Sequence, residues 1–159
     1  MKQELKQQYV SRITQANRTE LLVIVYELLQ QDLRQAMEEY EREELEAFQH
    51  SLQHARRFLV ELMETLDFKY ELSFELLSLY KFVNKVILDN LRKKEADGLK
   101  ECIGIIEKIK HSYEQLVPLD HSGPVMVNTQ KVYAGLTYGR HSLSEVSVDS
   151  TNGHRGLYA

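Results

Sequence analysis

An unbroken alternation of apolar residues, spaced by three and four positions, runs through residues 45–66. A helix completes a turn about every 3.6 residues, so this spacing places all of them on one face. Three heptads of such a pattern are typical of a helix packed in an antiparallel bundle or a coiled coil. The residues of this stripe are Leu45, Phe48, Leu52, Ala55, Leu59, Leu62 and Leu66.

Three further stripes of this kind lie before and after it. The first follows Asn17, the expected N-cap of its helix, because Glu20 three residues later completes a capping box. The last follows Asp97, its expected N-cap, and ends before Pro118. The expected core residues are Leu22, Val25, Leu29, Leu33, Ala36 and Tyr40, then Leu72, Leu76, Leu79, Val83 and Val86, and finally Leu99, Cys102, Ile106, Ile109, Tyr113 and Leu116. Short links favour antiparallel neighbours, so we predict an all-α fold, an antiparallel four-helix bundle with a short N-terminal helical arm.

The character of the chain changes at Pro118. Both prolines and five of the seven glycines lie at or after this position, and no helical period continues beyond it. We therefore expect the bundle in residues 1–117. Residues 118–159 are expected to form a Gly/Ser-rich C-terminal extension, which is either irregular or folded back on the bundle.

Composition and charge exclude several classes of protein. The net charge is -4, and the basic run of residues 92–94 is followed at once by Glu95 and Asp97, so we expect no binding of nucleic acid. The longest apolar run is interrupted by Glu27 and is too short to span a bilayer. The N-terminus lacks the apolar core of a signal peptide, and the single Cys102 cannot form an intrachain disulfide. We expect a cytoplasmic protein without membrane insertion.

No pattern of catalytic or metal-binding residues stands out. His50 and His54 have a spacing that can place two imidazoles on one metal, but both are expected on the solvent side of their helix, without an adjacent third ligand. The glutamates of residues 38–46 are expected to form a solvated face. Cys102 is expected to be a buried, inert thiol. No Gly-rich phosphate loop or nucleophile elbow occurs, so we predict no enzyme, no metal and no cofactor.

Two of the expected helices carry more apolar residues than one core stripe needs. In "ELLVIVYELLQ", residues 20–30, nearly every position is apolar, and the third helix has a similar surplus. A thick core would account for this, and so would a surface groove that binds an amphipathic segment of a partner, or self-association of the bundle. The residues alone leave these alternatives open. The surplus residues are Leu21, Ile24, Tyr26 and Leu28 in the first helix and Leu77, Tyr80, Ile87 and Leu91 in the third, where the polar Asn84 lies among them and is counted with them.

Three short motifs lie in the same order as in one known family. Tyr9 precedes "TQANRTELLVIVYE", Thr65-Leu66-Asp67 ends the second helix, and "LLSLYKFVNKVILDN" lies in the third. With these motifs, residues 9–117 resemble the FliS family of flagellar export chaperones. Ile109 and Tyr113 are similar to the closing motif of that family.

The resemblance favours a partner-binding groove over a thick core or self-association of the bundle. It implies a bacterial cytoplasmic chaperone that binds the disordered C-terminal region of flagellin, prevents premature polymerisation and delivers it to the export gate of the flagellar type III apparatus. The nine surplus residues would line the groove. The resemblance also implies a displaceable N-terminal lid, with Tyr9, Ile13 and Ala16 as its candidates. The alternative is a regulatory adaptor on the same bundle, binding another flagellar or secretion component.

The C-terminal extension has two interpretations. It is either a flexible extension rich in small polar residues, or a segment that folds back and covers the groove in place of a client. Six apolar residues within fifteen positions favour the second interpretation, because a mere spacer does not need them. They are Val132, Tyr133, Leu136, Tyr138, Leu143 and Val146.

Overall fold

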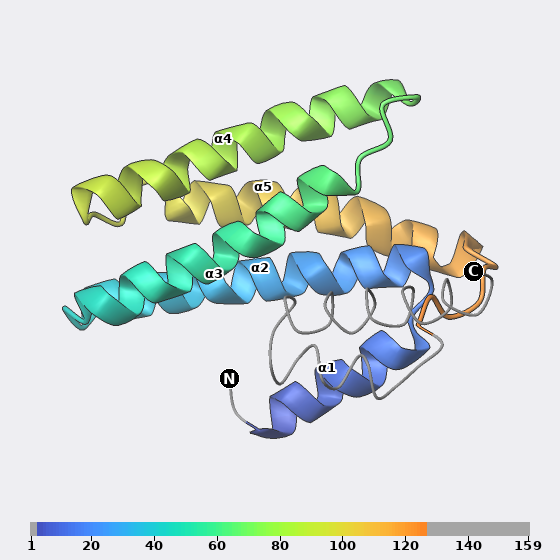
Figure 1. Cartoon of the computed structure of the whole chain (residues 1–159), viewed down its shortest axis with the longest axis horizontal. Coiled ribbons are helices and arrows are strands. Elements are labelled where there is room, and N and C mark those ends of the chain that lie inside the picture. Colours follow the sequence, from blue (N-terminus) through green and yellow to red (C-terminus); the bar gives the residue numbers. More distant parts are fainter. Residues whose placement is uncertain (1–2, 127–159) are drawn as a thin grey trace, which may run out of the picture. The chain divides into compact units, whose positions relative to one another are not determined.

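The computed structural model describes residues 3–126 of the 159-residue chain, which form helices and connecting segments without any strand (Figure 1). The predicted all-α fold is confirmed, with a helical arm before the four bundle helices. The six extension residues expected to cover the groove lie outside the described residues. The elements are α1 (Gln3–Gln15), α2 (Arg18–Glu41), α3 (Leu45–Glu64), α4 (Glu71–Lys93), α5 (Leu99–Leu116) and the 3-10 turn η1 (Val117–Leu119).

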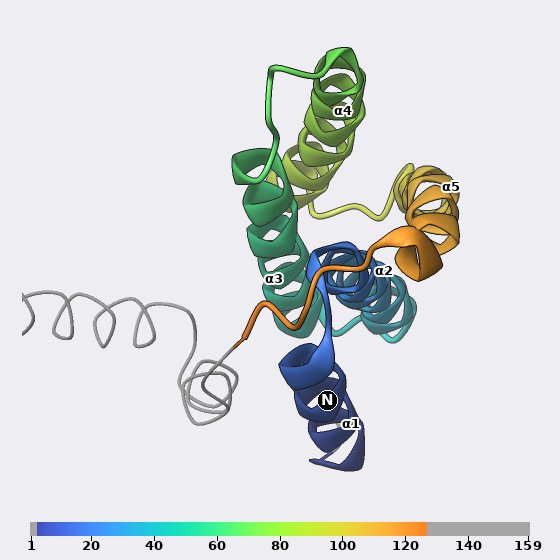
Figure 2. The same ribbon diagram turned by 90° about the vertical axis from the view of Figure 1, so that its right-hand side faces the viewer.

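The chain divides into two compact units. The bundle unit is Leu22–Leu119, and the terminal unit combines Met1–Leu21 with Asp120–Ala159. Within the bundle unit, α3 packs on α4 and α4 packs on α5, while side-chain hydrogen bonds join α2 to both α3 and α5. Each helix therefore neighbours the next along the chain, and Figure 2 shows the four of them around a shared interior. This is the up-down-up-down order that short connections favour.

The core of the bundle unit is formed by one stripe from each helix. The stripe of α3 is confirmed from Phe48 to Leu62, whereas Leu45 at its start is exposed. Each fully buried aliphatic or aromatic side chain of such a core stabilises the fold by about 1.5–3 kcal/mol. The core residues are Tyr26, Leu29, Leu33 and Ala36, then Phe48, Leu52, Ala55, Leu59 and Leu62, then Leu76, Tyr80, Val83 and Ile87, and finally Leu99, Cys102, Ile106 and Ile109.

The predicted core face of α4 was partly wrong. Leu72 and Leu79 were expected in the core but expose 56% and 38% of their surface, whereas Tyr80 and Ile87, expected beside it, are buried. The observed stripe from Leu76 to Ile87 has the same three-and-four spacing as the predicted one. Both stripes therefore satisfy the helical period, and the helix is rotated so that only one of them faces the interior.

In α2 both apolar stripes are covered. Ile24 and Leu28, which belong to the surplus stripe, are buried, whereas Leu22 and Val25 of the expected core stripe are only partly buried. At the end of the helix, Tyr40 is also only partly buried. The surplus apolar residues of α2 are thus largely inside the protein.

Polar side chains join α2 to its two neighbours inside the bundle. The Ser51 hydroxyl of α3 donates to the carboxylate of Glu39 at 2.6 Å, and both residues are buried. On the other side, the buried Gln30 donates to the Glu107 carboxylate of α5 at 2.6 Å and to the carbonyl of Ile103 at 3.3 Å. Since a buried polar group is costly unless it is paired, these bonds favour one relative position of the helices.

The helix starts agree with the sequence in one case and differ in another. The Asn17 side chain accepts the backbone N–H of Glu20 at 2.8 Å, which confirms it as the N-cap of α2. The prediction that Asp97 caps α5 was wrong, because the N-cap is Gly98, in a left-handed conformation with a φ of 74°. The backbone of Asp97 instead bonds the buried Asn90 side chain, which donates at 2.7 Å and accepts at 2.9 Å.

Between residues 3 and 126, no helix carries an apolar run long enough to cross a bilayer.

Candidate partner-binding surface

The structure separates the nine predicted groove residues into two sets. Buried members have little surface for a partner in this conformation, and they are Ile24, Tyr26, Leu28, Tyr80 and Ile87. Partly exposed members are Leu21, Leu77, Asn84 and Leu91. Leu77, Asn84 and Leu91 follow each other at intervals of seven on α4, and Asn84 accepts a hydrogen bond from Arg56 of α3 at 3.0 Å. Their role in partner binding stays a prediction.

Two of the buried members belong to a tyrosine cluster that joins three helices. The hydroxyls of Tyr26 on α2 and Tyr80 on α4 share a short hydrogen bond, and the ring of Tyr113 on α5 lies 5.6 Å from that of Tyr26 between centroids. Burial raises the pKa of Tyr80 to about 12 and that of Tyr26 further still. The phenols therefore stay neutral, and the cluster is a structural element of the core.

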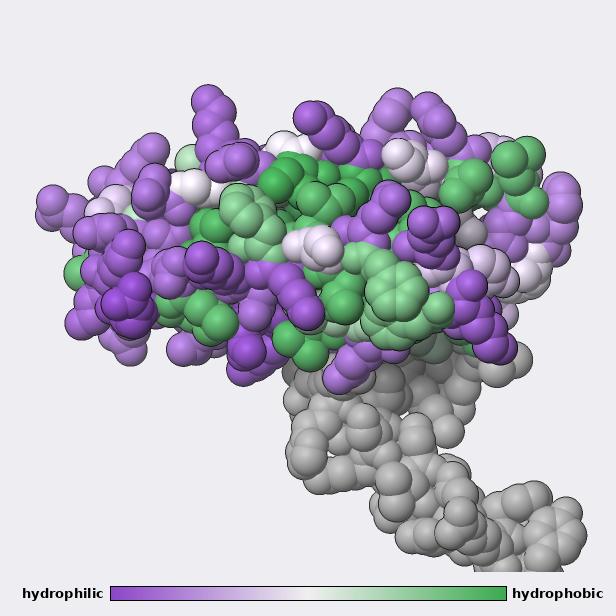
Figure 3. Space-filling view, turned by 90° about the horizontal axis from the view of Figure 1, so that it is seen from above, coloured by the Kyte–Doolittle hydropathy of each residue, from purple (hydrophilic) through white to green (hydrophobic). Residues whose placement is uncertain are grey.

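The apolar surface that α4 does expose lies beside its buried stripe. Leu72, Leu79 and Phe82 expose 56%, 38% and 40% of their surface, and Val86 is partly exposed. At one turn per about 3.6 residues, these four residues lie within about 80° of one another on the helix. We call them the α4 apolar band. Figure 3, which views the molecule from the side on which α4 lies in Figure 1, shows hydrophobic surface bordered by hydrophilic side chains.

The α4 apolar band lies on the flank of α4 that faces α5. A Cβ added to Gly98, which directly precedes α5, would lie 3.4 Å from a methyl carbon of Val86. The opposite flank, with Asn84, contacts α3. On α5, Ile105 packs partly buried against the core and Leu116 is exposed. Sequence analysis assigned Leu72, Leu79 and Val86 to the core, so this surface was not predicted.

A second group of exposed aromatic residues lies at the turn between α3 and α4. The rings of Phe68 and Phe74 lie 5.1 Å apart between centroids, and Tyr70 is the most exposed aromatic residue of the group. The turn is ordered by Asp67, whose carboxylate accepts the N–H of Lys69 at 3.0 Å. Exposed aromatic side chains on a hydrogen-bonded turn offer a second apolar contact surface.

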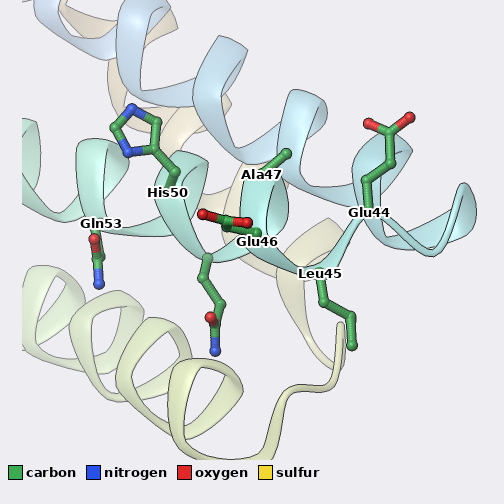
Figure 4. A pocket seen from close by; sticks show the side chains of 7 residues that line it. Glu44, Leu45, Glu46, Ala47, His50 and Gln53 are labelled. Carbon is green, nitrogen blue, oxygen red and sulfur yellow. The ribbon is translucent and has the colours of Figure 1, made fainter.

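A shallow pocket lies over the first turns of α3. Figure 4 shows Glu44, Glu46 and His50 spread along the helix, without convergence on one point. His50 is exposed as predicted, whereas the 43% exposed side chain of His54 faces the solvent only in part and lies 2.6 Å from the Asp32 carboxylate of α2. Within residues 3–126, no group of three His, Cys, Asp or Glu side chains is arranged to hold a metal ion.

The candidate lid residues lie on α1 and directly after it. Ile13 and Ala16 are buried, and the guanidinium of Arg12 lies over the ring of Tyr9, 5.5 Å from its centroid. Whether these residues move when a partner binds stays a prediction. The extension residues that sequence analysis proposed as a cover are not among the described residues.

Comparison with known proteins adds a family to this geometry. The family model of the flagellar protein FliS matches residues 1–120, which include all five helices and η1. No curated protein matches the sequence. The match includes the tyrosine cluster and the α4 apolar band, and it ends at Asp120. The chain therefore belongs to the FliS family of flagellar export chaperones.

Proposed function

We propose that this protein is a cytoplasmic, non-enzymatic export chaperone for flagellin. It binds the disordered C-terminal segment of flagellin, prevents premature polymerisation and delivers the segment to the flagellar type III export apparatus. The observation that carries the proposal, beside family membership, is the α4 apolar band, which remains exposed although the core of the bundle is complete.

The geometry of the α4 apolar band suits a helical client segment. Leu72, Leu79 and Val86 follow one another at intervals of seven, with Phe82 between them, so they form a line along the helix. An amphipathic segment can lay its own apolar stripe along such a line. While that stripe is engaged by the chaperone, it cannot pair with another flagellin molecule, and this blocks polymerisation.

The release of the client follows from the cost of ordering it. A disordered segment that folds on binding loses conformational entropy, which lowers the affinity that a given contact area provides. The complex is therefore specific yet reversible, as delivery to an export apparatus requires. Leu77, Asn84 and Leu91 lie on the other flank of α4, where Asn84 bonds Arg56 of α3, and they are not included in this contact surface. The α1 arm is proposed to be displaceable.

A titration of the full chain with a labelled peptide of the flagellin C-terminal segment tests the proposal. Changing both Leu79 and Phe82 to serine removes two side chains that are about 40% exposed and that a client would cover. Covering this remaining surface is worth about 0.6–1.2 kcal/mol for each side chain, so we expect affinity to fall by about tenfold or more.

The matched control is Leu88→Ser, because Leu88 is 42% exposed on the same helix but lies outside the α4 apolar band. We expect its affinity to stay within about twofold of the parent. A peptide that does not bind the parent chain would contradict the chaperone proposal. Equal losses in the double variant and in the control would instead contradict the choice of surface.

The second candidate function is a regulatory adaptor that binds another flagellar or secretion component. It is favoured by residues 121–159, which lie beyond the family match and contain the six apolar residues proposed to cover the groove. Deleting residues 127–159 tests this candidate, because it leaves the described part of the chain intact. Self-occlusion requires the truncated chain to bind the flagellin peptide more tightly, and an unchanged affinity would contradict it.

A further inference from the structure

The segment that follows η1 is hydrogen-bonded to the junction between α1 and α2. Thr19 donates to one carboxylate oxygen of Asp120 through both its backbone N–H, at 3.1 Å, and its hydroxyl, at 2.6 Å. The Asn17 side chain donates to the Asp120 carbonyl at 3.2 Å, and the Val125 N–H donates to the Ala16 carbonyl at 3.1 Å. Residues more than 100 positions apart are thus joined by four bonds.

Asp120 supplies a hydrogen-bond acceptor for a backbone N–H group at the start of α2. The first N–H groups of a helix have no partner within it and form the positive end of its dipole. Asn17 accepts the N–H of Glu20, and Asp120 accepts that of Thr19, so two different residues satisfy two adjacent donors. Bonds from Ser122 and then from Thr19 hold the pKa of the Asp120 carboxyl well below its usual range. The carboxylate therefore stays ionised throughout the physiological pH range.

The two residues bonded by this segment form the linker between α1 and α2. Only Ala16 and Asn17 separate the end of α1 from the start of α2, so any change in the direction of α1 relative to the first turn of α2 must occur in their backbone. The carbonyl of Ala16 and the side chain of Asn17 are both bonded by the segment, and Ala16 is fully buried. Figure 1 shows the segment, in orange, next to this blue junction.

We propose that Asp120–Val125 is a clasp that holds the Ala16–Asn17 linker in place, so that displacement of α1 and opening of the clasp form a single switch. By the reciprocity of linked equilibria, whatever binds preferentially to the chain with α1 displaced also opens the clasp, and whatever opens the clasp also frees α1. This inference does not depend on which client the protein binds.

Amide hydrogen exchange on the full-length chain tests the coupling from both sides. Asp120→Ala removes the carboxylate, and the informative readouts are the amides of Val125 and of the last turn of α1, which Asp120 does not contact. We expect them to exchange about tenfold faster. The matched control is Asp89→Ala, which removes an exposed carboxylate of α4 and should leave these amides unchanged.

The reverse perturbation uses Val125→Pro, which removes the N–H that Ala16 accepts, with Val125→Ala as its control. We expect the proline variant, and not the alanine variant, to speed exchange at the Thr19 amide. Faster exchange at both ends of the clasp and in the last turn of α1 supports the single switch. The proposal is overturned if either perturbation acts only at its own contact, or if α1 keeps its protection while the clasp opens.

Discussion

Removing the hydroxyl of Tyr26 tests how the core of the bundle is held together. Tyr26 and Tyr80 expose 0% and 1% of their surface, so water cannot replace the hydrogen bond between them. In Tyr26→Phe the hydroxyl of Tyr80 loses this partner, and an unpaired buried hydroxyl costs about 1–3 kcal/mol. In Tyr80→Phe the hydroxyl of Tyr26 loses the same partner, so we expect a similar cost, about 1–3 kcal/mol.

The double variant decides whether this account is right. With both residues changed to phenylalanine, no hydroxyl of the pair is left unpaired, and replacing both partners by apolar groups of the same shape is nearly neutral. We therefore expect the double variant to be no less stable than Tyr26→Phe alone. In a double-mutant cycle, this corresponds to a coupling energy between the two positions that is at least as large as the cost of Tyr80→Phe, about 1 kcal/mol or more.

Urea unfolding followed by far-UV circular dichroism measures these differences. With a slope of about 2 kcal/mol per molar urea, a loss of 2 kcal/mol lowers the midpoint by about 1 M. Tyr70→Phe is the control, because Tyr70 is 67% exposed and its hydroxyl can bond water in the folded protein. Strictly additive losses from the two core positions, or a loss in Tyr26→Phe no larger than in the control, would refute the reasoning.

Three further predictions concern single groups. Burial raises the pKa of Tyr80 to about 12 and that of Tyr26 further, so between about pH 10 and pH 12 these phenols ionise mainly in the unfolded chain. The free energy of unfolding should therefore be unaffected below about pH 10 and should fall by about 2–3 kcal/mol for Tyr80 alone by pH 12. Urea midpoints that stay level over this range would contradict this prediction. Gly98 and Lys94 both have left-handed backbones, which favour glycine. Gly98→Ala should therefore lower the free energy of unfolding by about 1 kcal/mol, and Lys94→Gly should raise it by about 0.5–1 kcal/mol. A Gly98→Ala variant that melts at a higher temperature than the Lys94→Gly variant would refute this. Cys102 is buried and its pKa is raised to about 11, so a thiol reagent should label it only on unfolding, and rapid labelling of the native protein would count against its burial.

The sequence predicts a helix best where it offers a single apolar stripe. In α3 no second continuous apolar stripe runs beside the one from Phe48 to Leu62, so the helical period leaves one choice of buried face, and the structure has that face. In α4 two stripes satisfy the period, and the sequence alone does not say which of them the neighbouring helices cover. The buried positions of Tyr80 and Ile87 depend on the rotation of α4 against α3 and α5, which is a property of tertiary packing.

The candidate surface was difficult to predict for the same reason. Leu72 and Leu79 have the spacing of core residues, and exposure becomes visible only when the neighbouring helices are in place. The contacts of Asp120 with Asn17 and Thr19 were missed for a different reason, since they join residues more than 100 positions apart that no local motif relates. By contrast, Asn17 was predicted as a helix cap, because both partners of that bond lie within four residues.

The polar bonds between α2 and its neighbours have a consequence for a bundle that keeps part of its apolar surface exposed. Apolar stripes alone would let one helix slide by a turn along another at little cost, because the same kinds of side chain would meet again. A slip of one turn, about 5.4 Å, would separate the carboxylate of Glu39 from Ser51 and Gln30 from Glu107, leaving buried polar groups without partners. These bonds therefore fix the register of α2 against α3 and α5, which the apolar stripes alone would not do.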